Sequence, residues 1–199
     1  KGIYMDYLES IKNDNIFFLE IGAYNGKSFD GLYKYTSLNN WTGILVEPIK
    51  EYFQDLKLNF KNIENKFFEN SAITEEDGEF NIKRIVGDKK WMKGSSTLVT
   101  NDNTKKYEYV EEKINGITFN TLVNKYNITK IDVLQIDTEG SDLIILEQII
   151  PRFIPKFVSV EQRHLIYRDK MKLKKILRSA GYTIKNCKNG GLNYLCWQI

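Results

Sequence analysis

The chain has 199 residues, of which 42% are hydrophobic and 13% aromatic, a composition that fits one globular domain and excludes a disordered protein. The net charge of +3 is too small to indicate a nucleic-acid partner on its own. No apolar run reaches the 18 or so residues of a membrane span and no signal peptide is recognisable, so we expect no membrane contact and a cytoplasmic location.

The first part of the chain alternates apolar runs with amphipathic segments. Residues 15–20 and 42–47 are continuously apolar, which is typical of strands buried on both faces. Residues 65–73 predict a further strand, and residues 49–58 predict a helix. Residues 28–38 predict a helix whose packed face would carry Phe29, Leu32 and Tyr33.

Residues 78–118 interrupt this alternation. The segments "GEFNIKRI" (78–85) and "YEYVEEKI" (107–114) resemble two strands that enclose a long polar loop. We therefore expect a β-rich insertion over 78–118 inside a single domain that spans 1–199.

Strand and helix alternate again after the insertion, with strands expected at 131–137 and 156–161 and helices at 141–150 and 169–180. The packed face of the first of these helices would carry Leu143, Ile144 and Leu146, and that of the second Leu173, Ile176, Leu177 and Ala180.

The last segments, "GYTIKNC" and "LNYLCWQI", alternate in polarity around "KNGG" and predict an antiparallel hairpin. The pattern as a whole predicts an α/β fold with a doubly wound, Rossmann-like, mostly parallel sheet closed by this hairpin. Cys187 and Cys196 lack a metal-type spacing, so they are expected to be buried thiols of a reducing compartment, with a cross-strand disulfide as the alternative.

Each of the four most apolar strands ends in an acid, namely Glu20, Glu47, Asp137 and Glu161. In an open α/β sheet the ligand crevice lies at the carboxyl ends of the strands, so these acids would converge there. Each acid taken singly could also be the N-cap of the following helix. A shared ligand site explains all four together better.

The turn after the first strand, "EIGAYNG", contains Gly22 and Gly26, which would allow a ligand to approach the backbone closely. Glu47 follows 21 positions after Gly26 and suits a carboxylate that binds ribose hydroxyls. The turn lacks the G-x-G-x-x-G pattern of NAD-type dehydrogenases, and Glu20 would repel a pyrophosphate. A cationic nucleoside, S-adenosyl-L-methionine, fits better, although simple turn chemistry remains the alternative for the glycines.

Six segments together resemble the FkbM-type S-adenosylmethionine-dependent methyltransferases. They are "FFLEIGAYNGKS", "GILVEPIKEYFQDL", "ENSAIT", "GSSTL", "KIDVLQIDTEGSDLIIL" and "VSVEQRH". The resemblance implies a class I methyltransferase fold and methyl transfer to oxygen, commonly of a sugar-type hydroxyl. The chain departs from the family pattern at Gln135 (usually Lys), Asp142 (often Glu) and Asn120 (usually an acid).

The predicted cofactor-binding residues lie on the turns after the first, second and fourth of the parallel strands and beside the third. They are Glu20, Gly22, Ala23, Tyr24, Gly26, Ser28, Glu47, Pro48, Asn70, Ser71, Ala72 and Asp137. Glu20 could instead have a purely structural bond to backbone N–H groups. Asn70 and Ser71, expected beside the adenine, could equally face solvent.

The predicted catalytic residues are Asp137, Glu139, Glu161 and His164. Asp137 is the first choice, Glu139 is a base or an acceptor ligand, and His164 could be an ordinary surface residue. Glu139 could also be a helix N-terminal acid of no catalytic role. We expect no complete metal-ligand set, although Asp137 and Glu161 could hold Mg²⁺ with water.

The loop "DKKWMKGSSTLVTND" is the candidate acceptor-binding lid, with Trp91, Lys93, Ser95 and Ser96 as contacts to a glycan or other small acceptor. Trp91 could stack on a sugar or base, and the lysines could meet a phosphate. The loop could equally be a solvated surface. Methylation of a carbohydrate-like hydroxyl is therefore the leading function, with RNA or a nucleotide sugar as alternative acceptors and a non-catalytic cofactor-binding module as the rival class.

Overall fold

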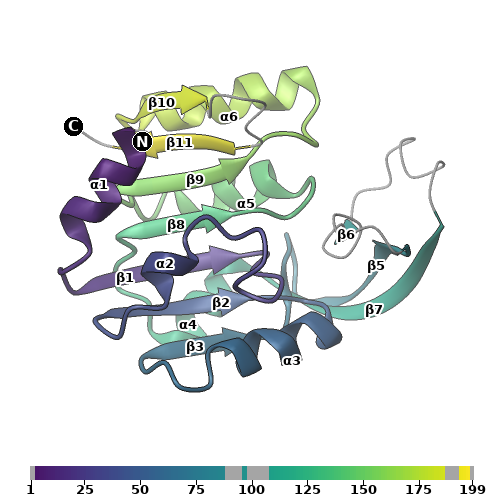
Figure 1. Ribbon diagram of the computed structural model, residues 1–199. Coiled ribbons are helices and arrows are strands. Elements are labelled where there is room, and N and C mark those ends of the chain that lie inside the picture. The colour runs from purple at the N-terminus through teal and green to yellow at the C-terminus, as the bar shows by residue number, and fades with distance from the viewer. Residues whose placement is uncertain (1–2, 88–95, 98–107, 187–192, 198–199) are drawn as a thin grey trace.

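The structure is a computed structural model that describes residues 3–87, 96–97, 108–186 and 193–197. Its centre is a seven-stranded sheet in the order β10-β11-β9-β8-β1-β2-β3 (Figure 1). The strands are β1 Ile16–Ile21, β2 Trp41–Val46, β3 Lys66–Glu69, β8 Val133–Ile136, β9 Phe157–Glu161, β10 Thr183–Asn186 and β11 Asn193–Trp197. Five strands are parallel, whereas β11 runs antiparallel to both β9 and β10. The predicted fold class is confirmed.

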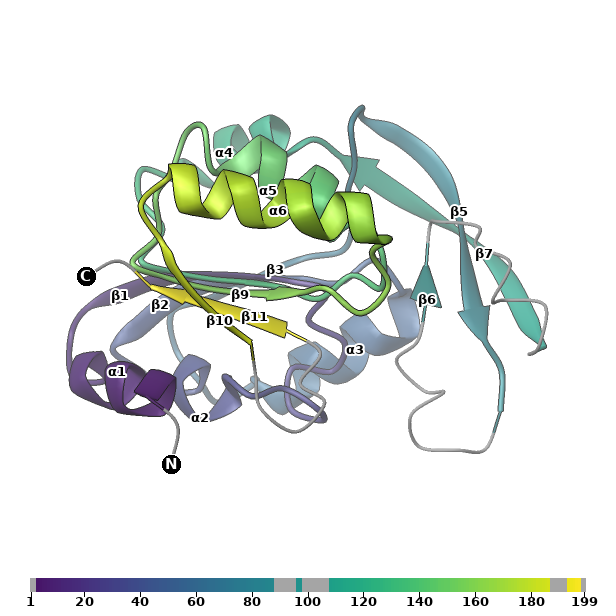
Figure 2. The same cartoon turned by 90° about the horizontal axis from the view of Figure 1, so that it is seen from above.

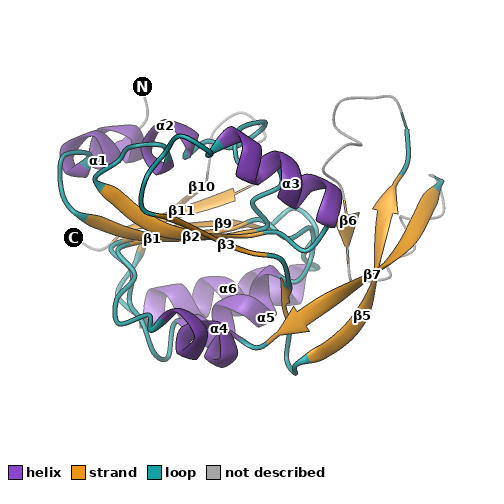
Figure 3. Ribbon diagram, turned by 90° about the horizontal axis from the view of Figure 1, so that it is seen from below, coloured by secondary structure: helices purple, strands orange, loops and turns teal. Residues whose placement is uncertain are grey.

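Helices cover both faces of this sheet, which explains why its central strands are apolar along their whole length. Figure 3 shows α1, α2 and α3 on one face and α4, α5 and α6 on the other. The helices are α1 Ile3–Ile11, α2 Tyr33–Thr36, α3 Lys50–Asn59, α4 Phe119–Tyr126, α5 Asp142–Ile149 and α6 Tyr167–Ser179. None of the described helices is both long enough and apolar enough to span a bilayer.

Alternate residues of β1 and β8 enter two separate cores. Leu19 and Ile21 belong to the core under α4–α6, whereas Phe18 belongs to the core under α1–α3, with Trp41 and Leu45 of β2. Glu20 points to the same face as Phe18, because successive strand residues alternate between faces. Near its carboxyl end, the apolar sheet therefore carries acidic side chains on the α1–α3 face.

A second sheet, in the order β4-β7-β5-β6, projects as an arm beyond the carboxyl ends of the central strands (Figures 1 and 2). Its strands are β4 Ala72–Ile73, β5 Gly78–Ile85, β6 Ser96–Thr97 and β7 Tyr109–Ile117. β5 and β7 form the long antiparallel pair of the predicted insertion. The arm stands beside the edge of the sheet at which the acids gather.

The prediction of a helix over 28–38 is wrong, because only the four residues of α2, Tyr33–Thr36, are helical there. Phe29 has φ +64° and is 66% exposed, so it does not lie on a packed helical face. The side chain of Asn25 accepts the backbone N–H groups of Lys27 and Ser28, and Asp30 accepts that of Leu32. These side-chain bonds hold residues 25–32 as a loop in place of helical turns.

Two smaller expectations are corrected as well. The strand predicted over 65–73 breaks into β3 and β4 because Asn70 Nδ2 donates to the carbonyls of Glu47 and Pro48, at 2.9 and 3.0 Å, where the chain leaves the central sheet. In α5, Ile145 is buried and Ile144 is 37% exposed, so the packed face is rotated from the one predicted.

The thiol of Cys196 is free and buried, and Cys187 lies outside the described residues.

Candidate active site

The turn after β1 is fixed by backbone contacts. Gly22 has φ +81°, and a Cβ atom there would lie 1.8 Å from the carbonyl oxygen of Asp137. The backbone N–H groups of Gly22 and Ala23 both donate to the carbonyl of Val46 at 3.0 Å. Glycine is therefore required at position 22 by the neighbouring strand ends themselves, before any ligand is considered.

Gly26 closes the same turn, with φ +66°. A Cβ atom at this position would lie 2.4 Å from Leu56 Cδ1 and 2.6 Å from Phe60 Cε2, at the end of α3. Gly26 thus lets the loop pack on α3. Its place in the structure is explained by packing, and its predicted contact with a cofactor stays a prediction.

Glu47 follows β2 and is held by two backbone donors. Its Oε2 accepts the N–H of Tyr24 at 2.8 Å, and its Oε1 accepts the N–H of Ile49 at 2.8 Å. Burial raises the pKa of Glu47 to about 8, although both hydrogen bonds oppose that shift. Each oxygen keeps a second lone pair with which it could accept a hydroxyl.

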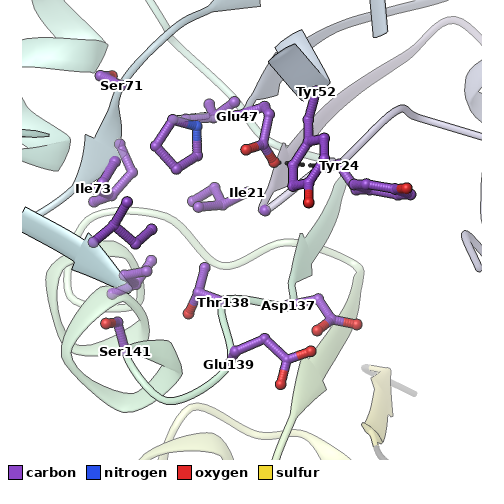
Figure 4. Close-up of a pocket in the computed structure, with 16 residues that line it drawn as sticks. Ile21, Tyr24, Glu47, Tyr52, Ser71, Ile73, Asp137, Thr138, Glu139 and Ser141 are labelled. Carbon is purple, nitrogen blue, oxygen red and sulfur yellow. Dashed lines mark hydrogen bonds between the residues drawn. The ribbon is translucent and has the colours of Figure 1, made fainter. Parts of the chain in front are cut away.

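Glu47 lines a pocket at the carboxyl ends of β1, β2 and β8, with about 550 Å³ of empty space including its open mouth (Figure 4). Eight of the predicted site residues line it: Gly22, Tyr24, Glu47, Pro48, Ser71, Ala72, Asp137 and Glu139. Strand-end residues far apart in the sequence thus form one cavity.

Two aromatic rings form one wall of the pocket. The rings of Tyr24 and Tyr52 meet edge to face with their centroids 4.6 Å apart. The guanidinium of Arg84, on β5, lies 5.6 Å from the centre of the Tyr52 ring, and its Nη1 is 3.1 Å from Glu51 Oε2. These contacts attach the arm to α3 at the side of the pocket.

Two hydroxyl groups of the lining are buried without a partner among the described residues, Ser71 Oγ and Thr138 Oγ1. Buried hydroxyls are normally hydrogen-bonded, so both indicate a polar ligand. Together with Glu47 and the aromatic wall they suit a nucleoside with a polar base and ribose hydroxyls. The residues present therefore fit an adenosine-containing cofactor.

The turn after β8 brings acidic groups to the opposite side of the pocket from Glu47 (Figure 4). Asp137 donates its backbone N–H to the carbonyl of Ile21 at 2.9 Å. Its burial raises the pKa of the side chain to about 7, and the neighbouring carboxylates of Asp142 and Glu139 act in the same direction. The surroundings of Asp137 thus raise its pKa above the ordinary value, a shift that is common at functional sites.

Asp142 shapes this turn. Its two oxygens accept the N–H groups of Thr138 and Gly140 at 3.1 and 3.0 Å. Glu139, between these two donors, has φ +57°, an uncommon conformation for a residue other than glycine. Asp142 thus holds the turn in which Asp137 and Glu139 lie.

His164, in the segment after β9, contacts this turn. Its Nε2 lies 2.6 Å from Glu139 Oε2 and 4.0 Å from Glu161 Oε1. Burial raises the pKa of Glu161 to about 10, and the carboxylates of Asp137 and Glu139 also raise it. The four predicted catalytic residues are thus brought together, although only Asp137 and Glu139 line the pocket.

Glu20 lies beside the pocket and does not line it. Its Oε1 accepts Gln135 Nε2 at 3.3 Å, and the same nitrogen donates to Asp30 Oδ1 at 3.2 Å. Burial raises the pKa of Glu20, and Asp30 and Asp137 add to that effect. Gln135, which departs from the family pattern, therefore connects two carboxyl groups.

The other predicted contacts have different surroundings. Ala23, Gly26, Ser28 and Asn70 are absent from the pocket lining; Ser28 accepts Asn25 Nδ2 at 3.1 Å, and Asn70 binds backbone carbonyls. Trp91, Lys93 and Ser95 lie outside the described residues, as do Lys89 and Lys90. Ser96 lies in β6, where its backbone pairs with that of Arg84.

Sequence reasoning missed several lining residues, chiefly Tyr52, Ile82, Thr138, Ser141 and Ile145. Tyr52 lies in the first turn of α3, and its position five residues beyond the strand-end acid Glu47 was the available signal. Thr138 and Ser141 share the turn of Asp137. Ile82 comes from the insertion, and no local pattern links it to the pocket.

The strand order, the glycine turn and the acids at the strand ends define a class I, S-adenosylmethionine-dependent methyltransferase fold. Comparison with protein families agrees: the family described as "Methyltransferase FkbM domain" matches residues 20–184. The chain belongs to this methyltransferase family, as the sequence motifs predicted. No curated protein gives a significant match.

Solved structures share the fold at low sequence identity. The precorrin-6y C5,15-methyltransferase of Geobacter metallireducens GS-15 aligns with a TM-score of 0.54 and 11% identity, over 98% of this chain and 87% of that one. A putative rRNA methylase of Clostridium thermocellum aligns with a TM-score of 0.52 and 7% identity, over 98% of this chain and 94% of that one. The N-terminal domain of human METTL16 in complex with S-adenosylhomocysteine aligns with a TM-score of 0.51 and 13% identity, over 98% of this chain and 68% of that one.

Proposed function

We propose that the protein transfers a methyl group from S-adenosyl-L-methionine to a hydroxyl of a carbohydrate-like acceptor. The observation that carries this proposal is the composition of one pocket. Glu47 and the aromatic wall lie at one side, and the turn of Asp137 and Glu139 lies at the other. The choice of a carbohydrate hydroxyl comes from the family resemblance, and the cytoplasmic location stays a prediction.

When bound, the cofactor supplies a methyl group that is activated by its sulfonium. The protein has to orient it and to align the acceptor, and alignment of bound reactants can contribute about 7–11 kcal/mol. In this proposal Glu47 binds the ribose and Tyr24 and Tyr52 flank the nucleoside. Ser71 and Thr138 offer buried hydroxyls to its polar atoms.

Asp137, Glu139, Glu161 and His164 form the acceptor end. A hydroxyl acceptor has to lose its proton, and a positioned base typically contributes about 10²–10⁴-fold. His164 in contact with Glu139 is one means of accepting that proton. A cation held by the same side chains is the other means, because it would lower the pKa of the hydroxyl.

Calorimetry with S-adenosylhomocysteine tests the cofactor half of the proposal. We expect saturable binding by the full chain with one site. A dissociation constant of about 1 mM corresponds to a binding free energy of only about 4 kcal/mol. Absence of binding even at about 1 mM ligand would therefore contradict the proposal. NADH serves as the control ligand, because the glycine turn lacks the dehydrogenase pattern and should not bind it.

Asp137→Asn tests the acceptor half. The substitution keeps the size of a buried side chain, so we expect S-adenosylhomocysteine affinity within about threefold and methyl release at least about 100-fold slower. The matched control is Asp132→Asn, near the amino end of the same strand, where the carboxylate accepts the N–H of Phe17. Full turnover of Asp137→Asn would show that the carboxyl group has no part in the reaction.

Methyl transfer is best measured across panels of glycans, nucleotide sugars and RNA, by the mass gained by the acceptor. A carbohydrate preference supports the proposal, whereas a preference for RNA or for nucleotide sugars would identify the alternative acceptors. A chain that binds S-adenosylhomocysteine and methylates none of them would be the non-catalytic module.

A further inference from the structure

Three side chains at the acceptor end have donor atoms close enough to share one metal ion. Glu139 follows β8, Glu161 ends β9 and His164 lies in the segment after β9, and one ligand atom of each falls within 4.8 Å of the others. The closest pair, His164 Nε2 and Glu139 Oε2, is 2.6 Å apart, and His164 Nε2 is 4.0 Å from Glu161 Oε1.

A second observation points to a missing cation at this place. Glu161 is 2% exposed, and its Oε2 is buried without an N–H or hydroxyl donor among the described residues, while its side chain meets the carboxyl group of Asp137, with which it can bond only by sharing a proton. Buried carboxyl oxygens are normally paired, so an oxygen left without a donor is unfavourable. The carboxylates of Asp137 and Glu139 lie near it, so a positive ligand would relieve both their repulsion and the unpaired oxygen.

The backbone directs Glu139 toward this place. The two hydrogen bonds from Thr138 and Gly140 to Asp142 fix the turn, and Glu139 keeps its left-handed conformation between them. Its carboxylate thereby meets His164 from β8 while Glu161 approaches from β9. Glu161 ends β9, and Glu139 and His164 lie in the segments that follow the neighbouring parallel strands β8 and β9, so the paired strand ends bring the three donors together.

We propose that Glu139, Glu161 and His164 bind a divalent transition-metal ion, such as Mn²⁺ or Zn²⁺. Metal bonds of about 2.0–2.2 Å place neighbouring donors about 3.0–3.5 Å apart. The observed separations of 2.6 and 4.0 Å lie on either side of that range, and side-chain shifts of less than 1 Å bring both into it.

The donor set decides which metal is favoured. An imidazole nitrogen with two carboxylates suits Zn²⁺, Mn²⁺ or Fe²⁺, whereas Mg²⁺ prefers an octahedral shell of oxygens. This site therefore differs from the Mg²⁺ pair of Asp137 and Glu161 considered from the sequence. Three protein ligands leave positions open for water or for an acceptor hydroxyl, which the metal would polarise. That last role rests on the proposed function, whereas the binding of the ion does not.

The test is calorimetry of the chelator-treated full chain with Mn²⁺ and with Zn²⁺, in the absence of S-adenosylhomocysteine. Electron paramagnetic resonance of free Mn²⁺ provides an independent measure. We expect one ion per chain. His164→Ala and Glu161→Gln should each weaken binding at least about 100-fold, because loss of even a residue that supports a ligand typically costs 10–100-fold.

Glu147→Gln is the matched control, because Glu147 lies on α5 and pairs with Lys172 at 2.6 Å, outside the cluster. It should leave metal affinity within about twofold. Thermal unfolding of each variant separates a loss of ligands from a loss of fold. Absence of binding at about 1 mM of either ion, or equal affinity in the wild type and both variants, overturns the inference.

Titration of the same samples with S-adenosylhomocysteine keeps the two proposals apart. Binding of the nucleoside without binding of metal would leave the proposed function standing and would assign proton removal to His164 and Glu139. Binding of metal without the nucleoside would do the reverse, because the metal site would stand while the cofactor assignment fell.

Discussion

Beside β1 and β2, both oxygens of Glu47 accept backbone N–H groups, whereas at the ends of β8 and β9 the Oε2 atom of Glu161 has no described partner. Both carboxyl groups are buried, and burial raises the pKa of each. In the first region, backbone N–H groups alone thus provide a hydrogen bond to each oxygen of the buried carboxyl group. The second region depends on side chains, and its four acids, Asp137, Glu139, Asp142 and Glu161, outnumber the basic groups described beside them, Arg163 and His164.

This difference separates two kinds of evidence for a ligand. A carboxylate held by backbone donors is preorganised, so Glu47 can present its remaining lone pairs to a hydroxyl without moving. A buried carboxylate with an unpaired oxygen indicates that something is to be bound or shared. The first kind points to a cofactor site that is formed in advance, and the second to an acceptor or metal site that is completed by its ligand.

Gly22→Ala has the largest expected effect, because Gly22 is the point at which the two regions touch. A Cβ atom 1.8 Å from the carbonyl oxygen of Asp137 forces the backbone apart, and φ +81° adds strain. We expect a loss of about 3 kcal/mol or more in the free energy of unfolding, or about 6–12 °C in melting temperature. Affinity for S-adenosylhomocysteine should fall in parallel.

Gly31→Ala is the matched control, since a Cβ atom there meets nothing within 4 Å. Its stability should stay within about 0.5 kcal/mol of the wild type, measured by urea unfolding. A Gly22→Ala protein that was as stable as Gly31→Ala would show that the two strand ends are not rigidly joined.

The sequence was sufficient to predict the strands and the acids at their ends. Strands buried on both faces are continuously apolar, so a local pattern identifies them, and parallel strands bring their carboxyl ends to one edge by topology. Glu47 and Asp137 were found in this way. Gly22 was also singled out from the sequence, where the reason given was close approach of a ligand. The structure adds a nearer reason, because a Cβ atom at this position would collide with the carbonyl oxygen of Asp137.

What the sequence could not predict depends on contacts between distant segments. Gln135, on another strand, donates to both Glu20 and Asp30. Ile82, on the arm, lines the pocket. The loop around Phe29 was mistaken for a helix because its apolar spacing is helical while the side chains of Asn25 and Asp30 bind the backbone. Hydrogen bonds of this kind leave no periodic pattern.

Glu20→Gln tests whether unpaired buried carboxyl oxygens are costly throughout the site. Glu20 Oε2 has no described partner, and the pKa of the group is raised above its ordinary value of 4.5. Its contribution to stability is therefore fully present below pH 4.5 and is lost as the pH rises toward the folded-state pKa. Glutamine does not titrate, so the variant should be more stable at pH 8 by about 1–3 kcal/mol, with a smaller gain at pH 5.

Urea unfolding at the two pH values measures this gain, and Glu64→Gln, at an exposed position, is the control that should show none. A gain of the same size at both pH values would mean that the unpaired oxygen is not the cause. Loss of stability at pH 8 would contradict the distinction between satisfied and unsatisfied carboxyl groups.

Tyr52→Ala has the smallest expected effect and tests the region that is formed in advance. Its ring is buried and meets Tyr24 edge to face at 4.6 Å, and such contacts are worth about 0.5–1.5 kcal/mol, or about 2–10-fold in affinity. S-Adenosylhomocysteine should therefore bind about 2–10-fold more weakly, while metal affinity at the acceptor end stays unchanged. Tyr52→Phe keeps the ring and should bind within about twofold of the wild type. If Tyr52→Ala weakened metal binding as much as nucleoside binding, the two regions would act as one unit, since independent sites respond separately to a substitution in either.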